Sequence, residues 1–262
     1  MGNGDQQIPK TAETVALERL DLQHHLALQG GDAARRVLLV DFDPQGNAST
    51  GLGVDEHDRV VNSYRLVTGE VTAKTAIQES NVAGLDIIAA VVDLSAAEIE
   101  LTTIDRREFR LADAIQPIAA GYDYIIIDCP PSLGLLTVNA LCAAHSVLVP
   151  LQCEFFALEG LSQLIKTVDR VHKNLNPLLS IDGIILTMFD RRNKLSTQVA
   201  MDVKKHLQEK VFDTMIPRNV RVSEAPSFGM PAIIYDRRSK GSQAYLQLAD
   251  EILRRTNSKE AA

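Results

Sequence analysis

The sequence predicts an α/β fold, a mostly parallel, twisted sheet with helices on both faces. Short apolar runs rich in β-branched residues alternate with longer amphipathic stretches, which is typical of parallel strands joined by crossover helices. The 262 residues are 45% hydrophobic and 23% charged, so the chain can bury one large core. No repeat and no linker rich in proline and serine divides it. One domain therefore suffices.

Five segments are predicted as buried strands, because each is a short, mainly apolar run. They are residues 37–40, 85–88, 124–127, 146–149 and 181–186. Helices are expected between them, around residues 108–119, 133–143, 157–175 and 195–209. We also expect a helix from Ala12 to Gln29 and a strand from Val211 to Ile216. In such sheets ligands bind at the carboxyl ends of the strands.

Charge and composition exclude several classes of protein. No apolar run reaches the roughly 18–20 residues of a membrane span, and the N-terminus lacks the layout of a secretory signal. Cys129, Cys142 and Cys153 stand singly, which argues against a zinc module and favours a reducing cytoplasm. The net charge is −7, but residues 1–130 carry −11 and residues 131–262 carry +4. The basic half leaves room for a nucleic-acid surface, although an ordinary solvated surface explains it as well.

Two predicted strands end in acidic residues. Asp41 and Asp43 follow the first, and Asp128 follows another. A carboxylate at the tip of a buried strand is desolvated unless a cation or hydrogen-bond donors reach it, and Mg²⁺ takes carboxylates together with water and phosphate oxygens. An apolar strand that ends in Asp is the Walker B pattern of phosphoryl-transfer enzymes. A capping Asp explains either strand end alone, but the two together favour a nucleotide site.

Five segments, in order, resemble one family. They are residues 36–53, 122–132, 149–160, 216–227 and 235–241. The first contains Asp-Phe-Asp-Pro-Gln-Gly-Asn, and the second contains Ile-Asp-Cys-Pro-Pro-Ser. They resemble the ParA/Soj family of plasmid and chromosome partition ATPases, P-loop NTPases with a deviant Walker A motif. The resemblance covers about residues 36–255.

The resemblance implies a role for each matching residue. Asp43 is similar to the switch residue that positions the attacking water. Asp128 is similar to the Walker B carboxylate that holds Mg²⁺, and Asp41 to a neighbouring acid that supports the metal. Pro217 resembles the segment along the adenine of ATP, although a turn proline after a strand is the alternative. Phosphate contacts read no bases, so cationic side chains suffice for the family's DNA surface, which is matched by Arg218, Arg221, Arg237, Arg238 and Lys240.

The family's glycine-rich Walker A loop has no close counterpart. The nearest approximation runs from Gly4 to Thr11, in which Pro9 replaces a glycine and removes an N–H donor. Lys10 and Thr11 are then the candidate phosphate contacts. Because only three residues precede this segment, we expect the chain to lack the strand that leads into the loop, and hence a central strand. A miscalled or frameshifted gene start, a degenerate paralogue and a pseudogene product stay open as explanations.

The resemblance implies a homodimer that needs ATP and Mg²⁺, binds DNA non-specifically and is stimulated by a ParB-like centromere-binding protein. It implies the partition of plasmid or chromosomal DNA, in the cytoplasm on the nucleoid and without membrane contact. The expected organisation is an atypical segment at 1–35, a nucleotide-binding domain at 36–255 and a polar tail at 256–262. One alternative is a non-enzymatic protein of the same fold, and another is a MinD-like or nitrogenase-reductase-like protein. The polar C-terminus argues against a MinD-like membrane helix.

Overall fold

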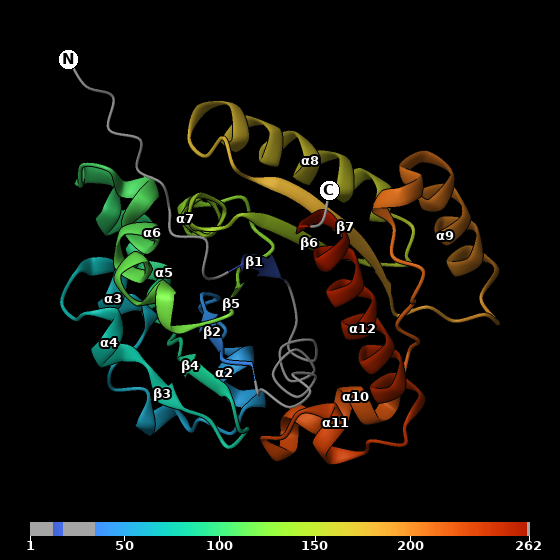
Figure 1. Ribbon diagram of the computed structural model, residues 1–262, viewed down its shortest axis with the longest axis horizontal. Coiled ribbons are helices and arrows are strands. Elements are labelled where there is room, and N and C mark those ends of the chain that lie inside the picture. Colours follow the sequence, from blue (N-terminus) through green and yellow to red (C-terminus); the bar gives the residue numbers. More distant parts are fainter. Residues whose placement is uncertain (1–12, 18–34, 261–262) are drawn as a thin grey trace.

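The computed structural model describes residues 13–17 and 35–260, with side chains from 35 to 256. In this part of the chain seven strands form one sheet, in the order β3-β4-β2-β5-β1-β6-β7 (Figure 1). All neighbouring pairs are parallel except β3 with β4, which confirms the predicted sheet. The strands are β1 (Glu13–Leu17), β2 (Val37–Asp41), β3 (Gln78–Glu79), β4 (Leu85–Ile88), β5 (Tyr124–Asp128), β6 (Ser146–Gln152) and β7 (Ser180–Thr187).

β1 occupies the centre of the sheet, between β5 and β6. It pairs with β5 along its whole length, from Glu13 opposite Tyr124 to Leu17 opposite Asp128, and with the start of β6. Two expectations are therefore wrong: residues 13–17 are not helical, and the sheet does not lack its central strand. The rest of the expected N-terminal helix lies outside the described residues. Short segments take their conformation from the neighbours they pair with, and local sequence does not reveal those neighbours.

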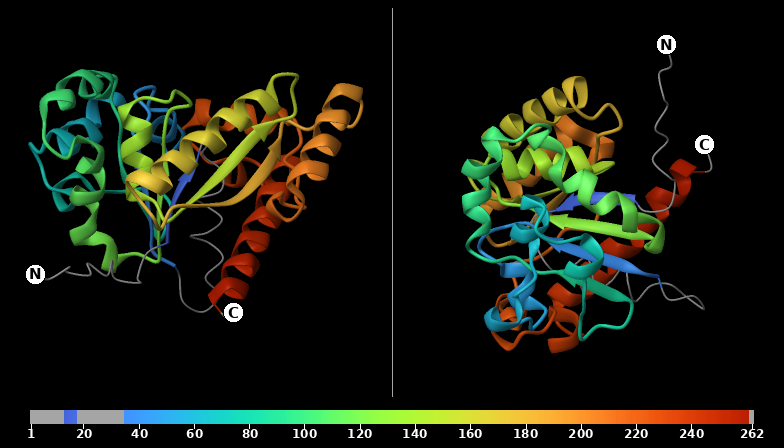
Figure 2. Two further views of the ribbon diagram at one scale, coloured as in Figure 1. Left: turned by 90° about the horizontal axis from the view of Figure 1, so that it is seen from above. Right: turned by 90° about the vertical axis from the view of Figure 1, so that its left-hand side faces the viewer.

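Helices cover both faces of the sheet (Figures 1 and 2). Successive residues of a strand point to opposite faces, so Leu39 packs with α12 (Lys240–Glu260) and α2 (Asn47–Gly51), whereas Leu38 packs with helices of the other face. On β6 and β7 that other face is covered by α8 and α9. The remaining helices are α3 (Ser63–Thr68), α4 (Ala73–Ala76), α5 (Leu94–Glu100), α6 (Arg110–Ile115), α7 (Leu135–Ala143), α8 (Ala157–Asn174), α9 (Lys194–Leu207), α10 (Val220–Glu224) and α11 (Ala232–Tyr235).

The five predicted strands are confirmed as β2, β4, β5, β6 and β7, and the four predicted helices as α6 to α9. The expected strand from Val211 to Ile216 is wrong. That segment forms no ladder with the sheet. It meets β7 through an isolated bridge from Val211 to Ile184 and through the N–H groups of Phe212 and Ile216, which donate to the carbonyls of Ile184 and Leu186. Among residues 35–260, no helix is both long and apolar enough to cross a bilayer. α12, which sequence reasoning missed, continues past residue 256, where the polar tail was expected to begin.

Candidate functional site

The carboxyl ends of β2 and β5 bring the two predicted metal-binding carboxylates together. Asp41 ends β2 and lies opposite Asp128, which ends β5. The pairing continues beyond the strands, because the N–H of Phe42 donates to the carbonyl of Asp128 at 2.7 Å. The exposed fractions of Asp41 and Asp128 are only 0% and 6%. Two buried acidic groups thus lie side by side at the edge of the sheet where parallel α/β folds bind ligands.

Asp41 is held by hydrogen bonds from the residues that follow it. Its Oδ2 accepts the backbone N–H of Ser49 at 2.7 Å and the Ser49 hydroxyl at 2.6 Å. Its Oδ1 accepts the N–H of Asp43 at 3.3 Å. Burial raises the pKa of Asp41 to about 6, although these hydrogen bonds act in the opposite direction. The carboxyl group is thus already bonded to the start of α2, and its role beside a metal stays a prediction.

Asp43 lies in the turn between β2 and α2. Its carbonyl accepts the N–H of Gly46 at 2.9 Å, and its Oδ1 accepts the N–H of Gln45 at 3.0 Å. Gly46 has a φ of +60°, a left-handed conformation that glycine adopts without strain. The side chain of Asp43 is half-buried, and within the described residues no hydrogen bond reaches its Oδ2. One carboxylate oxygen of Asp43 therefore has no hydrogen-bond donor among these residues.

Pro217 lies beside the end of β7. The N–H of Phe189 donates to the carbonyl of Ile216 at 3.1 Å, and the N–H of Arg218 donates to the carbonyl of Phe189 at 3.1 Å. Pro217 is half-buried. Because residues 211–216 form no strand, Pro217 is not a turn proline after one. Its contact with adenine stays a prediction.

Two side chains of α12 hold the segment that leads to Pro217. Glu251 accepts the N–H groups of Asp213 and Thr214, both at 2.9 Å. Arg255 donates to Glu251 at 2.8 Å. Burial raises the pKa of Glu251, but the backbone hydrogen bonds and the Arg255 charge outweigh it, so the pKa lies below its usual value. Sequence reasoning missed this arrangement because the partners of Glu251 lie far away along the chain.

The predicted DNA-binding residues gather around the amino end of α12. This basic surface consists of Arg218, Arg221, Arg237, Arg238 and Lys240, all exposed. Arg221 pairs with Glu224 at 3.0 Å and with Asp236 at 3.7 Å. Within the described residues, Arg237, Arg238 and Lys240 form no ion pair. The positive charge of the surface is therefore concentrated on these three side chains and Arg218.

The loop after β7 adds basic residues that sequence reasoning missed. Arg191, Arg192 and Lys194 are all exposed. Asp190 pairs with Arg192 at 3.0 Å, and its carboxylate also interacts electrostatically with Arg218. The loop therefore extends the basic surface. The available signal was the dense run Arg-Arg-Asn-Lys, which had no helical or strand periodicity.

The predicted phosphate contacts, Lys10 and Thr11, lie outside the described residues. Both precede β1 in the chain, whereas a P-loop follows its strand. The chain that leaves β1 after Leu17 continues Glu-Arg-Leu-Asp-Leu and contains no glycine before Gly30. Successive backbone N–H groups wrap a phosphate where glycines allow the loop to do so. The sequence after β1 therefore does not fit a glycine-rich phosphate loop.

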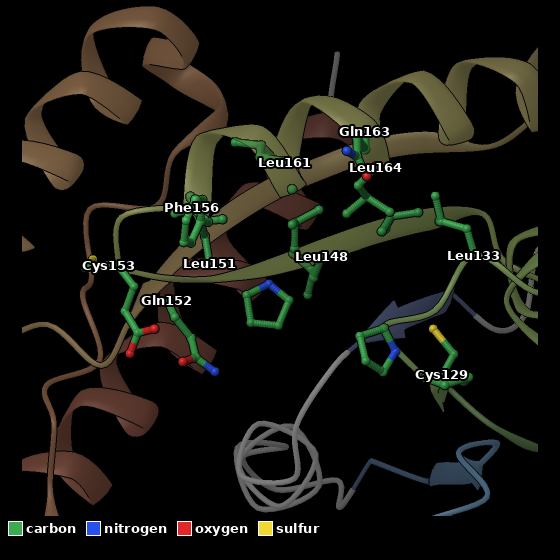
Figure 3. A pocket seen from close by; sticks show the side chains of 18 of the residues that line it. Cys129, Leu133, Leu148, Leu151, Gln152, Cys153, Phe156, Leu161, Gln163 and Leu164 are labelled. Atoms are coloured by element: carbon green, nitrogen blue, oxygen red, sulfur yellow. The ribbon is translucent and has the colours of Figure 1, made fainter.

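An apolar cavity of about 820 Å³ lies beside the acidic strand ends. Figure 3 shows its lining from the loop after β5, from β6 and from α8, including Cys129, Leu148 and Leu161. Phe155 and Phe156 also line it, and each is 72% exposed. Their rings meet edge to face with centroids 5.1 Å apart. Exposed aromatic side chains of this kind are typical of an interface.

Comparisons with known proteins place this geometry in a family. A family model described as an AAA domain matches residues 17–181. The chromosome partitioning protein ParA of Caulobacter vibrioides is 56% identical over 228 residues, 86% of this chain and 85% of that protein. The chain belongs to the ParA/Soj family. The sporulation initiation inhibitor protein Soj of Bacillus subtilis is 53% identical over 218 residues, 83% of this chain and 86% of that protein.

Solved structures confirm the P-loop fold of this ParA/Soj chain. Cobyrinic acid a,c-diamide synthase from Mycobacterium smegmatis, with bound ADP and magnesium, has a TM-score of 0.80 at 33% identity, covering 95% of this chain and 97% of that one. The cell division ATPase MinD of Pyrococcus furiosus has a TM-score of 0.74 at 24% identity, covering 93% and 99%. MinD shares the fold alone, whereas the synthase structure supports nucleotide and Mg²⁺ binding in proteins of this kind.

Proposed function

We propose that this protein partitions plasmid or chromosomal DNA as a ParA/Soj-type ATPase. The observation that supports this most is the pairing of Asp41 with Asp128 at neighbouring strand ends, in a chain 56% identical to a chromosome partitioning protein. The nucleotide-binding domain is proposed to comprise residues 36–255 together with β1. The segments around it, an atypical N-terminal region and a short polar tail, are proposed to lie outside the chemistry.

Asp128 is the residue proposed to hold Mg²⁺. Asp41 is proposed as the neighbouring acid that supports the metal. A buried carboxylate at a strand end fits a hard cation that takes carboxylate, water and phosphate oxygens. Bound Mg²⁺ would supply charge stabilisation at the phosphates. Asp43 is proposed to orient the attacking water, because its side chain is only half-buried and its Oδ2 accepts no hydrogen bond from the described residues. Pro217 is proposed to lie along the adenine.

The sequence lacks a good binding loop for the phosphates of ATP. No glycine follows β1 before Gly30, and Lys10 and Thr11 precede the strand. We therefore propose that the chain binds ATP weakly. The same observation favours a second candidate function, a non-enzymatic ParA-like protein that keeps DNA and partner contacts. Isothermal titration calorimetry with ATP, with and without Mg²⁺, distinguishes the two candidate functions. Only the ATPase is expected to bind ATP in a Mg²⁺-dependent way.

DNA binding is proposed for the basic surface, and association with the nucleoid is proposed with it. The homodimer is proposed to use the exposed apolar side chains beside the site, among them Phe155 and Phe156. A ParB-like centromere-binding protein is proposed as the partner that stimulates hydrolysis, on the resemblance alone. Each of these contacts is separate from the nucleotide question and is tested separately.

The DNA proposal is tested with two labelled duplexes of unrelated sequence. Binding to both should weaken equally in Lys240→Ala and should fall steeply between about 50 and 200 mM salt, since phosphate contacts dominate. Lys173 is the matched control, because it is an exposed lysine on α8 that pairs with Asp169 at 2.7 Å. Lys173→Ala should bind like the unmodified chain. A strong preference for one duplex contradicts the proposal.

A further inference from the structure

We propose that Arg59 is a positioning residue for Asp43, acting together with Asp41 and Ser49 through the short helix α2. We call Asp41, Ser49 and Arg59, with the Ala90 peptide that joins them, the α2 clamp. The inference rests on the proposed role of Asp43 in hydrolysis, and it assigns Arg59 and Ser49 no contact with nucleotide or metal. Its function is to fix the turn that carries Asp43.

α2 needs such support because it is only five residues long, Asn47–Gly51. An isolated helix of this length is unstable, since nucleating a helix costs more than one turn of hydrogen bonds returns. Its first turn contains no acidic residue and its last turn no basic one, so the helix itself carries no charge that favours its dipole. The charged groups near α2 come instead from outside the helix. Asp41 lies at the amino end, and the Arg59 guanidinium lies along the side of α2, from the N-cap residue Gly46 to Thr50.

At the amino end, Asp41 accepts two hydrogen bonds from Ser49, one from the backbone and one from the hydroxyl. Both groups are fully buried. A negative charge near the first turn of a helix is favourable, because the exposed N–H groups there carry partial positive charge. Asp41 therefore fixes the start of α2 to the end of β2.

Beside α2, Arg59 is only 8% exposed. Its Nη2 donates to Thr50 Oγ1 at 2.9 Å and to the Val54 carbonyl at 2.8 Å, while its Nε donates to the same carbonyl at 3.1 Å. Among residues 35–256, no carboxylate lies within 4.0 Å of this guanidinium. A buried arginine bonded to neutral oxygens alone is costly unless its donors are well placed. The donors of Arg59 therefore connect Thr50 of α2 to the Val54 and Ala90 carbonyls.

The backbone of Ala90, just beyond β4, joins Ser49 to Arg59. Its N–H donates to Ser49 Oγ at 3.0 Å, and its carbonyl accepts from Arg59 Nη1 at 3.2 Å. Arg59 also lies against Gly46, where a Cβ would come within 2.5 Å of Nη1. Gly46 in turn donates its N–H to the Asp43 carbonyl. The clamp therefore reaches Asp43 through Gly46, and a shift of α2 moves the turn.

Hydrogen exchange followed by NMR tests the clamp without any need for turnover. Arg59→Gln keeps hydrogen-bonding ability but removes the charge and most of the donors. Exchange at the Gly46, Thr50, Val54 and Ala90 amides should then be faster by about tenfold or more through local opening. Arg65→Gln is the control, because Arg65 is a nearby, partly exposed arginine that pairs with Glu70 at 2.9 Å. It should leave these amides within about twofold of the unmodified chain.

A second, milder variant keeps the test valid if Arg59→Gln unfolds globally. Thr50→Val removes one acceptor of Arg59 and the bond from the Thr50 hydroxyl to the Gly46 carbonyl at 3.0 Å. It should raise exchange at the same amides by a smaller factor, and in the Arg59→Gln background it should add little. Arg59→Lys keeps the charge but lacks the fork that spans Thr50, Val54 and Ala90, so it should resemble Arg59→Gln rather than rescue it. Unchanged exchange in both Arg59→Gln and Thr50→Val, or full rescue by lysine, overturns the proposal.

The link to Asp43 is tested by a double-mutant cycle on ATP turnover. Arg59→Gln should lower kcat by about tenfold or more with KM little changed, because its proposed role is to position Asp43 and not to bind substrate. In the Asp43→Ala background the same substitution should have no further effect, because the clamp acts only through Asp43. Additive losses contradict the positioning role. If no variant hydrolyses ATP, the proposed ATPase fails, while the exchange experiment still decides whether the clamp holds the turn.

Discussion

Asp41 and Glu251 are both buried carboxyl groups, yet among the side chains of residues 35–256 only Glu251 of the two has a cation beside it. Asp41 accepts hydrogen bonds from the neutral groups of Ser49 and from an amide, and burial raises its pKa to about 6. Glu251 adds an ion pair with Arg255 at 2.8 Å, and its pKa lies below the usual value. The two groups therefore make opposite contributions to the pH dependence of stability.

Asp41 should make the protein less stable as pH rises from about 4 to about 6. In this range the unfolded chain, with a carboxyl pKa of about 3.9, releases a proton that the folded chain keeps. The native state then binds more protons, so the free energy of unfolding falls with rising pH, by roughly 3 kcal/mol in all. Asp41→Asn should flatten this part of the curve in urea unfolding across a pH series. Parallel curves for the two proteins would contradict the raised pKa.

Glu251→Gln should destabilise the protein near neutral pH and have less effect in acid. The folded pKa is depressed, so the stabilising contribution is present above the unfolded pKa and is lost as pH falls through the folded value. Hydrogen bonds to a charged group contribute about 1.5–3 kcal/mol, a fall of several degrees in Tm. Asp169→Asn, which removes an exposed ion pair with Lys173, should change Tm by little. Equal shifts in the two variants would show that Glu251 does not hold its segment.

The arginines of the basic surface should contribute unequally to DNA affinity. Replacing Arg237 and Arg238 by Ala should reduce the slope of log affinity against log salt by about 0.9 for each lost phosphate contact. Arg221→Ala should change the slope less, because Glu224 and Asp236 already neutralise Arg221. Fluorescence anisotropy over a salt series measures both. An equal change in slope per residue would mean that these ion pairs open on binding.

Asp43 and Asp128 should affect different steps if ATP is hydrolysed. Asp43→Ala should lower turnover and leave ATP binding largely intact, because Asp43 acts on the water and not on the ground-state phosphates. Asp128→Ala should weaken the Mg²⁺-dependent part of binding. Titration with a fluorescent ATP analogue at several Mg²⁺ concentrations separates the two effects. Similar losses of binding in both variants would remove the distinction.

ATP with Mg²⁺ should not raise the Tm of the chain appreciably. A ligand at about 100 times its Kd stabilises a protein by about 2.7 kcal/mol, a shift of several degrees for tight binding. Because β1 ends at Leu17, a restoring graft belongs after this residue. Replacing residues 18–25 by Lys-Gly-Gly-Val-Gly-Lys-Thr-Thr should produce the ATP-dependent shift, and the same graft with both lysines changed to Ala should not. A shift in the unmodified chain would show that other groups bind the phosphates.

Local sequence was sufficient for most strands and for the long helices. β2, β4, β5, β6 and β7 are apolar runs buried in the sheet, and α9 has an apolar stripe at helical spacing, so composition and periodicity alone locate them. The acidic strand ends were found in the same way, because Asp41, Asp43 and Asp128 follow apolar runs directly. The family could be named from short ordered motifs for the same reason. Each of these features depends only on residues that are contiguous in the sequence.

The tertiary structure decided what depends on partners far along the chain. β1 is a strand because it lies between β5 and β6, and nothing within its five residues specifies that position. Asp41 accepts a hydrogen bond from Ser49, and Arg59 donates one to the carbonyl of Ala90, 31 residues away. Glu251 reaches amides 37 and 38 residues before it. Burial gives each of these polar groups a required partner, and only the packing of the whole sheet and its helices determines which partner is within reach.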